Sequence, residues 1–245
     1  MVNPRTNSTA AASSGKIESL RRRVAQAPDD LNGAIQLGSA LYQAGDIRGS
    51  ADVLRLALRY HPESHQAALL LARTEARQGQ LRPALDTVLK ALSAQPEQTK
   101  LLEFAAALCT QLRDWAELQQ LAETWTEHAP DSIAALTALA QSYFEQSKFA
   151  NALDSFARLS ELEPENEVHL IGAAKVAIAA LDFPRAKIYL HAAGEINAGS
   201  AELLFAYCRF HHLTGELELA LEYCEQALDL RPDMVAALIE LGILR

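Results

Sequence analysis

The amino-acid sequence predicts an all-α protein in which antiparallel helix pairs stack one after another. Alanine and leucine supply 84 of the 245 residues, whereas valine, isoleucine and threonine together supply 27, so an extensive β-sheet is disfavoured. Prolines recur with a period of 34 residues, and the apolar residues between them keep helical spacing. One helix pair in each period fits both observations.

The prolines mark the end of each repeat. They occupy a regular grid that only Ala198 interrupts: Pro28, Pro62, Pro96, Pro130, Pro164 and Pro232. If Leu31 is taken as place one, six full repeats of 34 residues run from residue 31 to residue 234. Proline at place thirty-two cannot continue a helix, because it lacks the N–H donor and clashes with the preceding turn. We therefore expect the second helix of each repeat to end there.

A turn is expected at place fifteen, between the two helices of each repeat. Glycine stands there in three of the six repeats, and glycine readily adopts the left-handed backbone conformation that closes a helix. The residues at this place are Gly45, Gly79, Arg113, Ser147, Leu181 and Gly215.

Apolar or small residues line one face of each predicted helix. In the first helix they recur at places four, seven, eight and eleven, and in the second helix at places twenty, twenty-four and twenty-seven. Place eight always holds a small residue, which lets two helices approach closely. Its occupants are Gly38, Ala72, Ala106, Ala140, Ala174, Cys208 and Gly242.

These features resemble the tetratricopeptide repeat. The 34-residue period, the Leu37-Gly38 pair, Tyr143 in its first helix, the small and aromatic places of the second helix and the closing proline carry the resemblance over residues 31–234. The resemblance implies a right-handed superhelical solenoid whose first helices line a concave groove. It implies nothing about catalysis.

The N-terminal residues are expected to differ from the repeats. Residues 1–15 lack the apolar segment of a secretory signal and are predicted to form a disordered tail, with a transit peptide as the alternative. Residues 16–27 carry Ile17, Leu20 and Val24 at helical spacing, and we expect them to form a single helix that caps the array.

Residues 235–245 begin a seventh repeat but supply only its first helix. Leu238, Leu241 and Gly242 continue the packing stripe, and only two side chains of this segment are charged. A helix that caps a repeat array is expected to be polar on its outer face. The sequence therefore favours two hypotheses: the chain is a fragment of a longer protein, or a partner or a second copy covers this end.

Charge is unevenly distributed along the chain. The formal net charge is -9, yet residues 1–130 carry 14 Lys and Arg against 14 Asp and Glu, while residues 131–245 carry 8 against 17. An acidic chain lacks the basic surface that a phosphate backbone requires, so no nucleic-acid partner is predicted. The longest apolar stretch, Leu170–Leu181, contains Lys175 and is too short to cross a membrane.

The sequence contains no motif of a known catalytic or cofactor site. Walker loops, G-x-G-x-x-G, H-E-x-x-H and nucleophile elbows are all missing, so we predict no catalytic residue, no cofactor and no metal. Three cysteines without a CxxC pair fit a reducing compartment, and the predicted localisation is cytoplasmic. We interpret Cys208 and Cys224, on facing places of one repeat, as two small core residues, with a redox pair as the alternative.

Three functions from different classes fit the sequence. The first is a protein-protein interaction scaffold that binds a peptide or protein segment in the groove, because a stacked array offers a long surface and no enclosed pocket. The second is the substrate-recruiting repeat region of a larger enzyme, such as a bacterial sulfotransferase or glycosyltransferase, with its catalytic domain beyond residue 245. The third is a self-assembling element, a homo-oligomer formed through the apolar C-terminal helix.

The face of the first helices opposite the packing stripe predicts the ligand. Places two, five, nine, twelve and thirteen form this face, whose net charge is about +2 by residue type. Two basic clusters, Arg73/Arg77/Lys100 and Lys175/Arg209, are expected to recognise acidic residues that flank apolar anchors in a peptide. The alternative is that these are ordinary solvated charges. The predicted peptide-binding residues are Ile35, Leu69, Arg73, Arg77, Lys100, Gln141, Ile171, Lys175, Phe205 and Arg209.

A C-terminal carboxylate is not the expected ligand. Members of the resembled family that clamp one carry Lys and Asn at places five and nine, whereas this sequence has Ile35 with Ser39 and Leu69 with Arg73. If the basic clusters bind the partner, changing Arg73 and Arg209 to Glu is expected to weaken binding and to leave thermal stability nearly unchanged.

Overall fold

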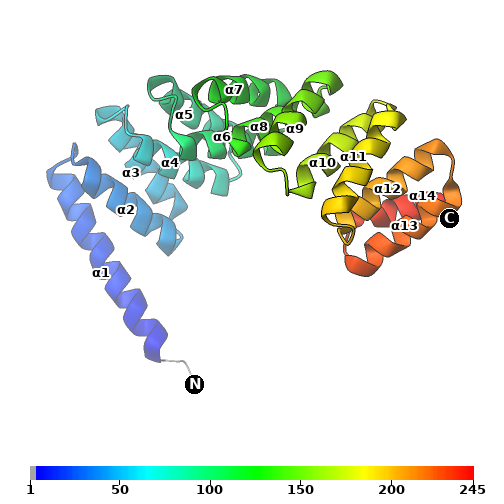
Figure 1. Ribbon diagram of the computed structural model, residues 1–245. Helices are drawn as coiled ribbons and strands as arrows, with labels where there is room; N and C mark the ends of the chain where they lie inside the picture. Colours follow the sequence, from blue (N-terminus) through cyan, green and yellow to red (C-terminus); the bar gives the residue numbers. More distant parts are fainter. Residues whose placement is uncertain (1–3) are drawn as a thin grey trace. The chain divides into compact units, whose positions relative to one another are not determined.

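A computed structural model describes the backbone of residues 4–245 and the side chains of residues 14–245. Within these residues the chain forms fourteen α-helices and no β-strand (Figure 1), which confirms the all-α fold class. None of these helices combines the length and the apolar composition needed to cross a bilayer. The chain divides into two compact units, Met1–Leu121 (unit 1) and Ala122–Arg245 (unit 2).

Unit 1 is a stack of helix pairs behind one leading helix. The first helices of the first two pairs pack against the second helix of their own pair, against the helix that precedes them, and against the first helix of the next pair. The unit boundary lies inside α7. The helices are α1 (Pro4–Gln26), α2 (Leu31–Ala44), α3 (Ile47–Tyr60), α4 (His65–Arg77), α5 (Leu81–Ala94), α6 (Thr99–Leu112) and α7 (Trp115–His128).

Unit 2 repeats the same packing. The first helices α10 and α12 again contact the second helices on either side, and α12 also contacts the first helices α10 and α14. Its helices after α7 are α8 (Ile133–Glu145), α9 (Phe149–Leu162), α10 (Glu167–Ala179), α11 (Phe183–Ile196), α12 (Ala201–Thr214), α13 (Leu217–Leu230) and α14 (Val235–Leu244).

Every turn between paired helices uses a left-handed residue at place fifteen. The three glycines there have φ of 77° to 85°, as the sequence predicted. Arg113, Ser147 and Leu181 adopt φ of 54°, 58° and 58°, although each carries a Cβ. A left-handed conformation costs a residue other than glycine roughly 1 kcal/mol. The geometry of the hairpin therefore imposes this conformation even where the sequence does not favour it.

Aspartates begin several helices by accepting backbone hydrogen bonds. Asp30 accepts from the Gly33 N–H at 3.0 Å at the start of α2, and Asp46 accepts from the Gly49 N–H at 2.9 Å at the start of α3. Each bond satisfies one of the donors that the first turn of a helix leaves unpaired. These caps fix where the helices begin, and hence the register of the hairpin.

The small residue at place eight lets the helices of a pair approach closely. A Cβ built on Gly38 would lie 2.8 Å from Cγ of Leu54, a side chain that is fully buried between α2 and the neighbouring helices. No side chain larger than hydrogen fits at Gly38 without moving Leu54. The stripe of small residues is therefore a packing requirement.

The leading helix is longer than the sequence analysis predicted. α1 begins at Pro4 and not at residue 16, so residues 4–15 belong to this helix and not to the expected tail. Residues 1–3 of that tail lie outside the described residues. Proline is well suited to the first turn of a helix, and the alanines that follow have the highest helix propensity, which accounts for the difference. Leu20 and Val24 pack against α2 as expected of a capping helix.

The last helix of unit 2, α14, exposes several apolar side chains to solvent. Ala237 is buried, whereas Val235, Ile239 and Ile243 are each more than half exposed. The expected packing stripe is only partly realised, because Leu238 is also exposed and Gly242 has no neighbouring atom within 4 Å of the position of a Cβ. No helix of the described chain covers this face of α14.

Candidate functional site

A hollow of about 560 Å³ lies along the first helices of unit 1. Residues of α2, α4 and α6 line it, together with the loop before α6, and we call it the first-helix hollow. Four predicted peptide-binding residues meet in it: Ile35, Leu69, Arg73 and Lys100. The remaining lining residues are Ser39, His65, Gln66, Leu70, Glu97, Gln98, Thr99 and Leu101.

The arginines at the first-helix hollow lie over aromatic rings, and Lys100 forms no ion pair with the described residues. The guanidinium of Arg73 lies 5.9 Å from the centre of the Phe104 ring. Arg77, beside the hollow, lies 4.8 Å from the Tyr42 ring and donates a hydrogen bond of 3.4 Å to the Tyr42 carbonyl oxygen. A guanidinium over an aromatic ring keeps its positive charge and can still donate hydrogen bonds to an anionic ligand. A carboxylate partner would neutralise that charge.

The half-buried leucine and isoleucine side chains give this hollow an apolar wall. Ile35 and Leu69 are both half-buried, so part of each faces solvent. Lys100 is exposed at the rim, and Glu97 is the one acidic residue among the lining residues. The combination of two cations, one carboxylate and an apolar wall suits a ligand with acidic and apolar groups.

A smaller hollow of about 210 Å³ lies along the first helices of unit 2. It contains three further predicted residues, Lys175, Phe205 and Arg209. Its walls are mainly apolar, because Phe144, Ile178, Ala179 and Ala206 complete the lining.

Lys175 lies in an unusual electrostatic position in this second hollow. Its side chain is exposed to solvent, but the protein that surrounds it lowers the pKa of its amine by desolvation, and the nearby charge of Glu202 only partly offsets that effect. Glu202 is itself paired with Arg231, at 2.7 Å. An ammonium group that is poorly solvated in this way gains more from an anionic ligand than a fully solvated one does.

Arg209 corrects the sequence analysis, because it is already paired. Its Nη1 lies 2.8 Å from Oε2 of Glu240, a residue of α14 that is only 3% exposed. His212 hydrogen-bonds through Nδ1 to the other oxygen of the same carboxylate. A buried carboxylate that loses a partner is destabilising, so the pair leads us to expect that changing Arg209 to Glu lowers thermal stability.

Two more predicted residues do not take part in these hollows. Ile171 is only 2% exposed and belongs to a core cluster with Leu190 and Leu203, because α12 covers the face of α10 on which it lies. Gln141 is half-buried on α8 and lines neither hollow. The groove face of the first helices is thus not a uniform surface from one repeat to the next.

The loop before α6 was missed by the sequence analysis. Glu97 and Gln98 line the first-helix hollow from this loop, and Thr99 lines it from the first residue of α6. Their position at the junction of two repeats, directly after the grid proline Pro96, is the signal that could have pointed to them. His65, at the place equivalent to Thr99 in the previous repeat, also lines the hollow and was not predicted.

The fold and the open hollows along first helices define a class of protein, the helical repeat arrays. Residues 35–99 match a family profile described as tetratricopeptide repeat, and residues 201–234 match a second profile with the same description. These two segments are therefore tetratricopeptide repeats. Proteins of this family generally serve as non-enzymatic scaffolds for protein-protein interaction.

One curated relative shares part of this sequence. Cellulose synthase operon protein C of Pseudomonas fluorescens (strain SBW25) is 33% identical over 86 residues, which are 35% of this chain. The match covers 7% of that protein, so the chain corresponds to a small part of the relative's length.

Solved structures share the fold at low sequence identity. The C-terminal part of a repeat protein from Cytophaga hutchinsonii matches with a TM-score of 0.69 at 14% identity, over 95% of this chain and 96% of that one. A tetratricopeptide repeat protein from Parabacteroides merdae matches with 0.58 at 17% identity, over 93% and 90%. YrrB, described as having an unusual peptide-binding site, matches with 0.56 at 18% identity, over 77% and 97%. These likenesses concern the fold.

Proposed function

We propose that the chain is an interaction scaffold that binds an acidic segment of a partner protein in the first-helix hollow of unit 1. One observation carries the proposal: Arg73 and Lys100, beside apolar Ile35 and Leu69, have no carboxylate partner among the ion pairs of the described residues. Arg77 stands close by on the same helix, with its charge also unneutralised. Cations that are not committed to the fold can pair with a ligand at little structural cost.

The predicted unit 2 cluster contributes less to this function. Arg209 is committed to Glu240, which leaves Lys175 as the cation of the second hollow. We assign that hollow to an apolar side chain of the ligand, because Phe144, Phe205 and Ile178 line it. The peptide-binding site of YrrB, a protein of similar fold, supports the choice of a peptide ligand.

A direct test uses a displayed library of random dodecapeptides, selected on the full chain and then measured individually by fluorescence anisotropy. Peptides that bind are expected to be enriched in Glu, Asp and Leu. Changing Arg73 and Lys100 to Glu is expected to weaken their binding at least tenfold, and raising salt is expected to weaken it in wild type. Arg48→Glu, which reverses one charge on exposed α3 outside the hollow, is the control for each single reversal. Selected peptides that bind the double variant as tightly as wild type would contradict the proposal.

A second candidate, that the array recruits a substrate for a larger protein, is favoured by one finding. The curated relative is a much longer protein, of which this sequence matches 7%. The test is the reading frame that encodes residue 245. An enzymatic domain in the same frame supports this candidate, and its absence contradicts it.

A further inference from the structure

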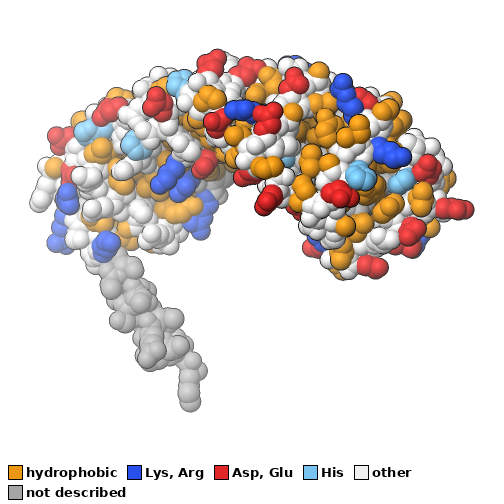
Figure 2. All heavy atoms as spheres, viewed as in Figure 1, with side chains coloured by type: hydrophobic (Ala, Val, Ile, Leu, Met, Phe, Trp, Pro, Cys, Tyr) orange, Lys and Arg blue, Asp and Glu red, His pale blue; other side chains and the backbone are white. Residues whose placement is uncertain are grey.

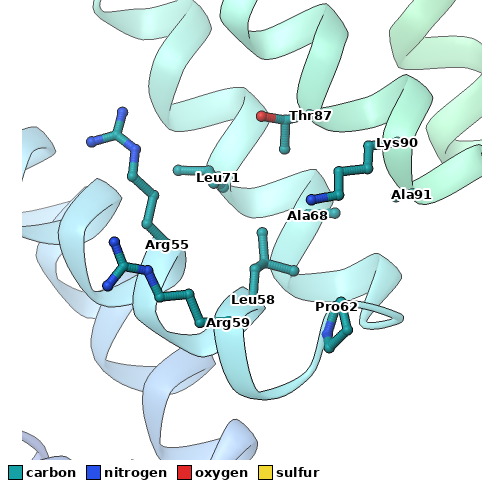
Figure 3. Close-up of a pocket in the computed structure, with 9 residues that line it drawn as sticks. All are labelled: Arg55, Leu58, Arg59, Pro62, Ala68, Leu71, Thr87, Lys90 and Ala91. Carbon is teal, nitrogen blue, oxygen red and sulfur yellow. The ribbon is translucent and has the colours of Figure 1, made fainter.

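A second hollow of unit 1 lies on its other side, among the second helices (Figure 3). Residues of α3 and α5 form its walls, and Ala68 and Leu71 of α4 lie between them. We call it the second-helix hollow. Its volume is about 220 Å³, and its lining residues are Arg55, Leu58, Arg59, Pro62, Ala68, Leu71, Thr87, Lys90 and Ala91.

Three cations surround this hollow, and one of them is neutralised. Arg55 donates to Oε1 of Glu75 at 3.0 Å, and Thr87 donates to Oε2 of the same buried carboxylate at 3.0 Å. Arg59 and Lys90 form no ion pair with the described residues. Figure 3 shows Arg59 on the α3 side and Lys90 extending from α5 on the opposite side. Two charges therefore flank the hollow without a partner from the fold.

The repeats themselves show that the fold does not require these cations. Arg59 occupies place twenty-nine of the first repeat, a solvent-facing place of the second helix. The same place holds an acidic residue in four of the other five repeats, where the hairpin forms equally well. Its occupants in the later repeats are Ser93, Glu127, Glu161, Glu195 and Asp229. A positive charge at this place is thus a feature of the first repeat and not of the hairpin.

Size and lining define what the hollow can hold. A volume of 220 Å³ is below the roughly 300 Å³ at which pockets for cofactors or drug-sized ligands begin, and holds about seven water molecules. Leu58 and Pro62 supply its accessible apolar surface, while Leu71 and Ala91 lie buried at its base. An occupant that satisfies both features carries one anionic group and one compact apolar group.

We propose that the second-helix hollow is a separate docking site for a partner protein, and that it takes an acidic side chain together with an adjacent leucine-sized side chain. The carboxylate lies between Arg59 and Lys90, where charge complementarity holds it. The apolar side chain rests on Leu58 and Pro62, which gives the site a preference that a simple anion cannot satisfy. The buried Glu75 holds Arg55 in the wall and keeps that guanidinium from competing for the ligand.

The test follows ¹⁵N-labelled full-length chain by NMR during titration with a pool of acetylated, amidated tetrapeptides of sequence Xaa-Glu-Leu-Xaa. We expect saturable shifts of the amides of α3 and α5 around Arg59 and Lys90. A matched pool with Gln in place of Glu is expected to bind at least tenfold more weakly. Inorganic phosphate, the third probe, is expected to bind more weakly than the Glu pool because it makes no apolar contact.

Two variants separate this site from the fold and from the first-helix hollow. Arg59→Glu, a charge that four other repeats carry at the same place, is expected to abolish the shifts and to leave the spectrum folded. Arg48→Glu on the same helix is expected to leave binding unchanged. Arg73→Glu changes the first-helix hollow only. If the two sites are separate, this variant leaves the shifts around Arg59 and Lys90 unchanged.

Each other outcome overturns the proposal. If the shifts are absent in wild type, or persist in Arg59→Glu, the proposed site does not exist. Equal binding of the Gln pool removes the role of charge. If phosphate binds as tightly as the Glu pool, the ligand of this site is a phosphoryl group and not an acidic side chain.

Discussion

Unit 1 and unit 2 share one packing scheme and differ in the chemistry of their surfaces. Unit 1 carries 14 Lys and Arg against 12 Asp and Glu, a net +2, whereas unit 2 carries 8 against 19, a net -11. Acidic side chains are prominent in Figure 2 over the region of α12–α14. Of the cations that line the unit 1 hollows, Arg55 is paired with Glu75, whereas the others form no ion pair with the described residues. The buried carboxylate Glu240 of unit 2 is paired inside the fold. The same hairpin therefore supports opposite electrostatic roles.

This difference predicts where an acidic partner first makes contact. At physiological ionic strength charges act over about 8 Å, so the sign of the nearest surface decides the encounter. Unit 2 repels an acidic segment, and unit 1 attracts it. If the partner segment is acidic, as proposed, we expect it to meet unit 1 before it occupies a hollow.

The largest expected effect concerns the cores, where the units should behave alike. Leu54 in unit 1 and Leu190 in unit 2 occupy the same place of their repeats, and both are fully buried. Truncating either to Ala leaves a cavity and is expected to cost about 3 kcal/mol. Urea unfolding followed by circular dichroism measures the cost. A loss below about 1 kcal/mol in one unit alone would show that its core is loosely packed.

The next effect separates the units. Arg209→Glu places a second carboxylate beside buried Glu240 and is expected to destabilise the chain by about 2 kcal/mol, a value reduced because Arg209 is itself partly exposed. Arg73→Glu, a charge reversal at an exposed unit 1 arginine, is expected to change stability by less than about 0.5 kcal/mol. Thermal denaturation of both variants checks the difference. Equal melting temperatures would show that the pairing of Glu240 contributes nothing.

Acid is expected to weaken the same contact. Burial raises the pKa of the Glu240 carboxyl, but hydrogen bonds with His212 and Arg209 outweigh burial and hold the pKa below its ordinary value. A carboxyl with a lowered folded-state pKa stabilises the fold above its unfolded pKa of about 4.3, and this contribution disappears as the pH falls through the folded value.

Glu240→Gln provides the comparison for this pH dependence. The variant is expected to be less stable than wild type by about 1 kcal/mol at pH 7, and this difference should shrink below pH 4.3. Urea unfolding at pH 7, 5, 4 and 3 measures it. A difference that stays constant with pH would mean that the ionised form is not the one the fold stabilises.

The smallest effect tests the turns. Leu181 is left-handed and exposed in unit 2, whereas the equivalent turns at Gly45 and Gly79 of unit 1 already carry glycine. Leu181→Gly removes the steric cost of the left-handed backbone and is expected to stabilise the chain by about 0.5 kcal/mol after the entropy of glycine is subtracted. The converse variant Gly45→Ala is expected to destabilise. Stabilities that move in the opposite directions would contradict the role of this backbone conformation.

Most of the fold was predictable because packing and turn geometry repeat. Pro62 ends a second helix, Gly45 closes a first helix, and Gly38 lies beneath Leu54, each for a reason that recurs every 34 residues. Features without a period were not predictable. The start of α1 at Pro4 depends on local propensity alone, and the division of the chain after Leu121 depends on the balance of contacts in space.

The candidate site was predictable in part for the same reason. Helical spacing brought Ile35, Leu69 and Arg73 to one face, and the structure gathers them in one hollow. Spacing could not show that Arg209 pairs with Glu240, since the partner lies 31 residues away and its burial depends on how α14 packs. Nor could it show that α12 buries Ile171.

Place twenty-nine, where Arg59 stands among acidic counterparts, has a consequence for the history of such a chain. Residues that hold the hairpins together and residues that meet a partner occupy different places, so selection can act on one set without disturbing the other. A duplicated hairpin inherits its architecture intact and is then free to acquire a new specificity through one or two surface substitutions. If Arg59 meets a partner as proposed, the differences among hairpins at this place reflect recognition, while the recurring small residues and turns reflect the requirement to stack.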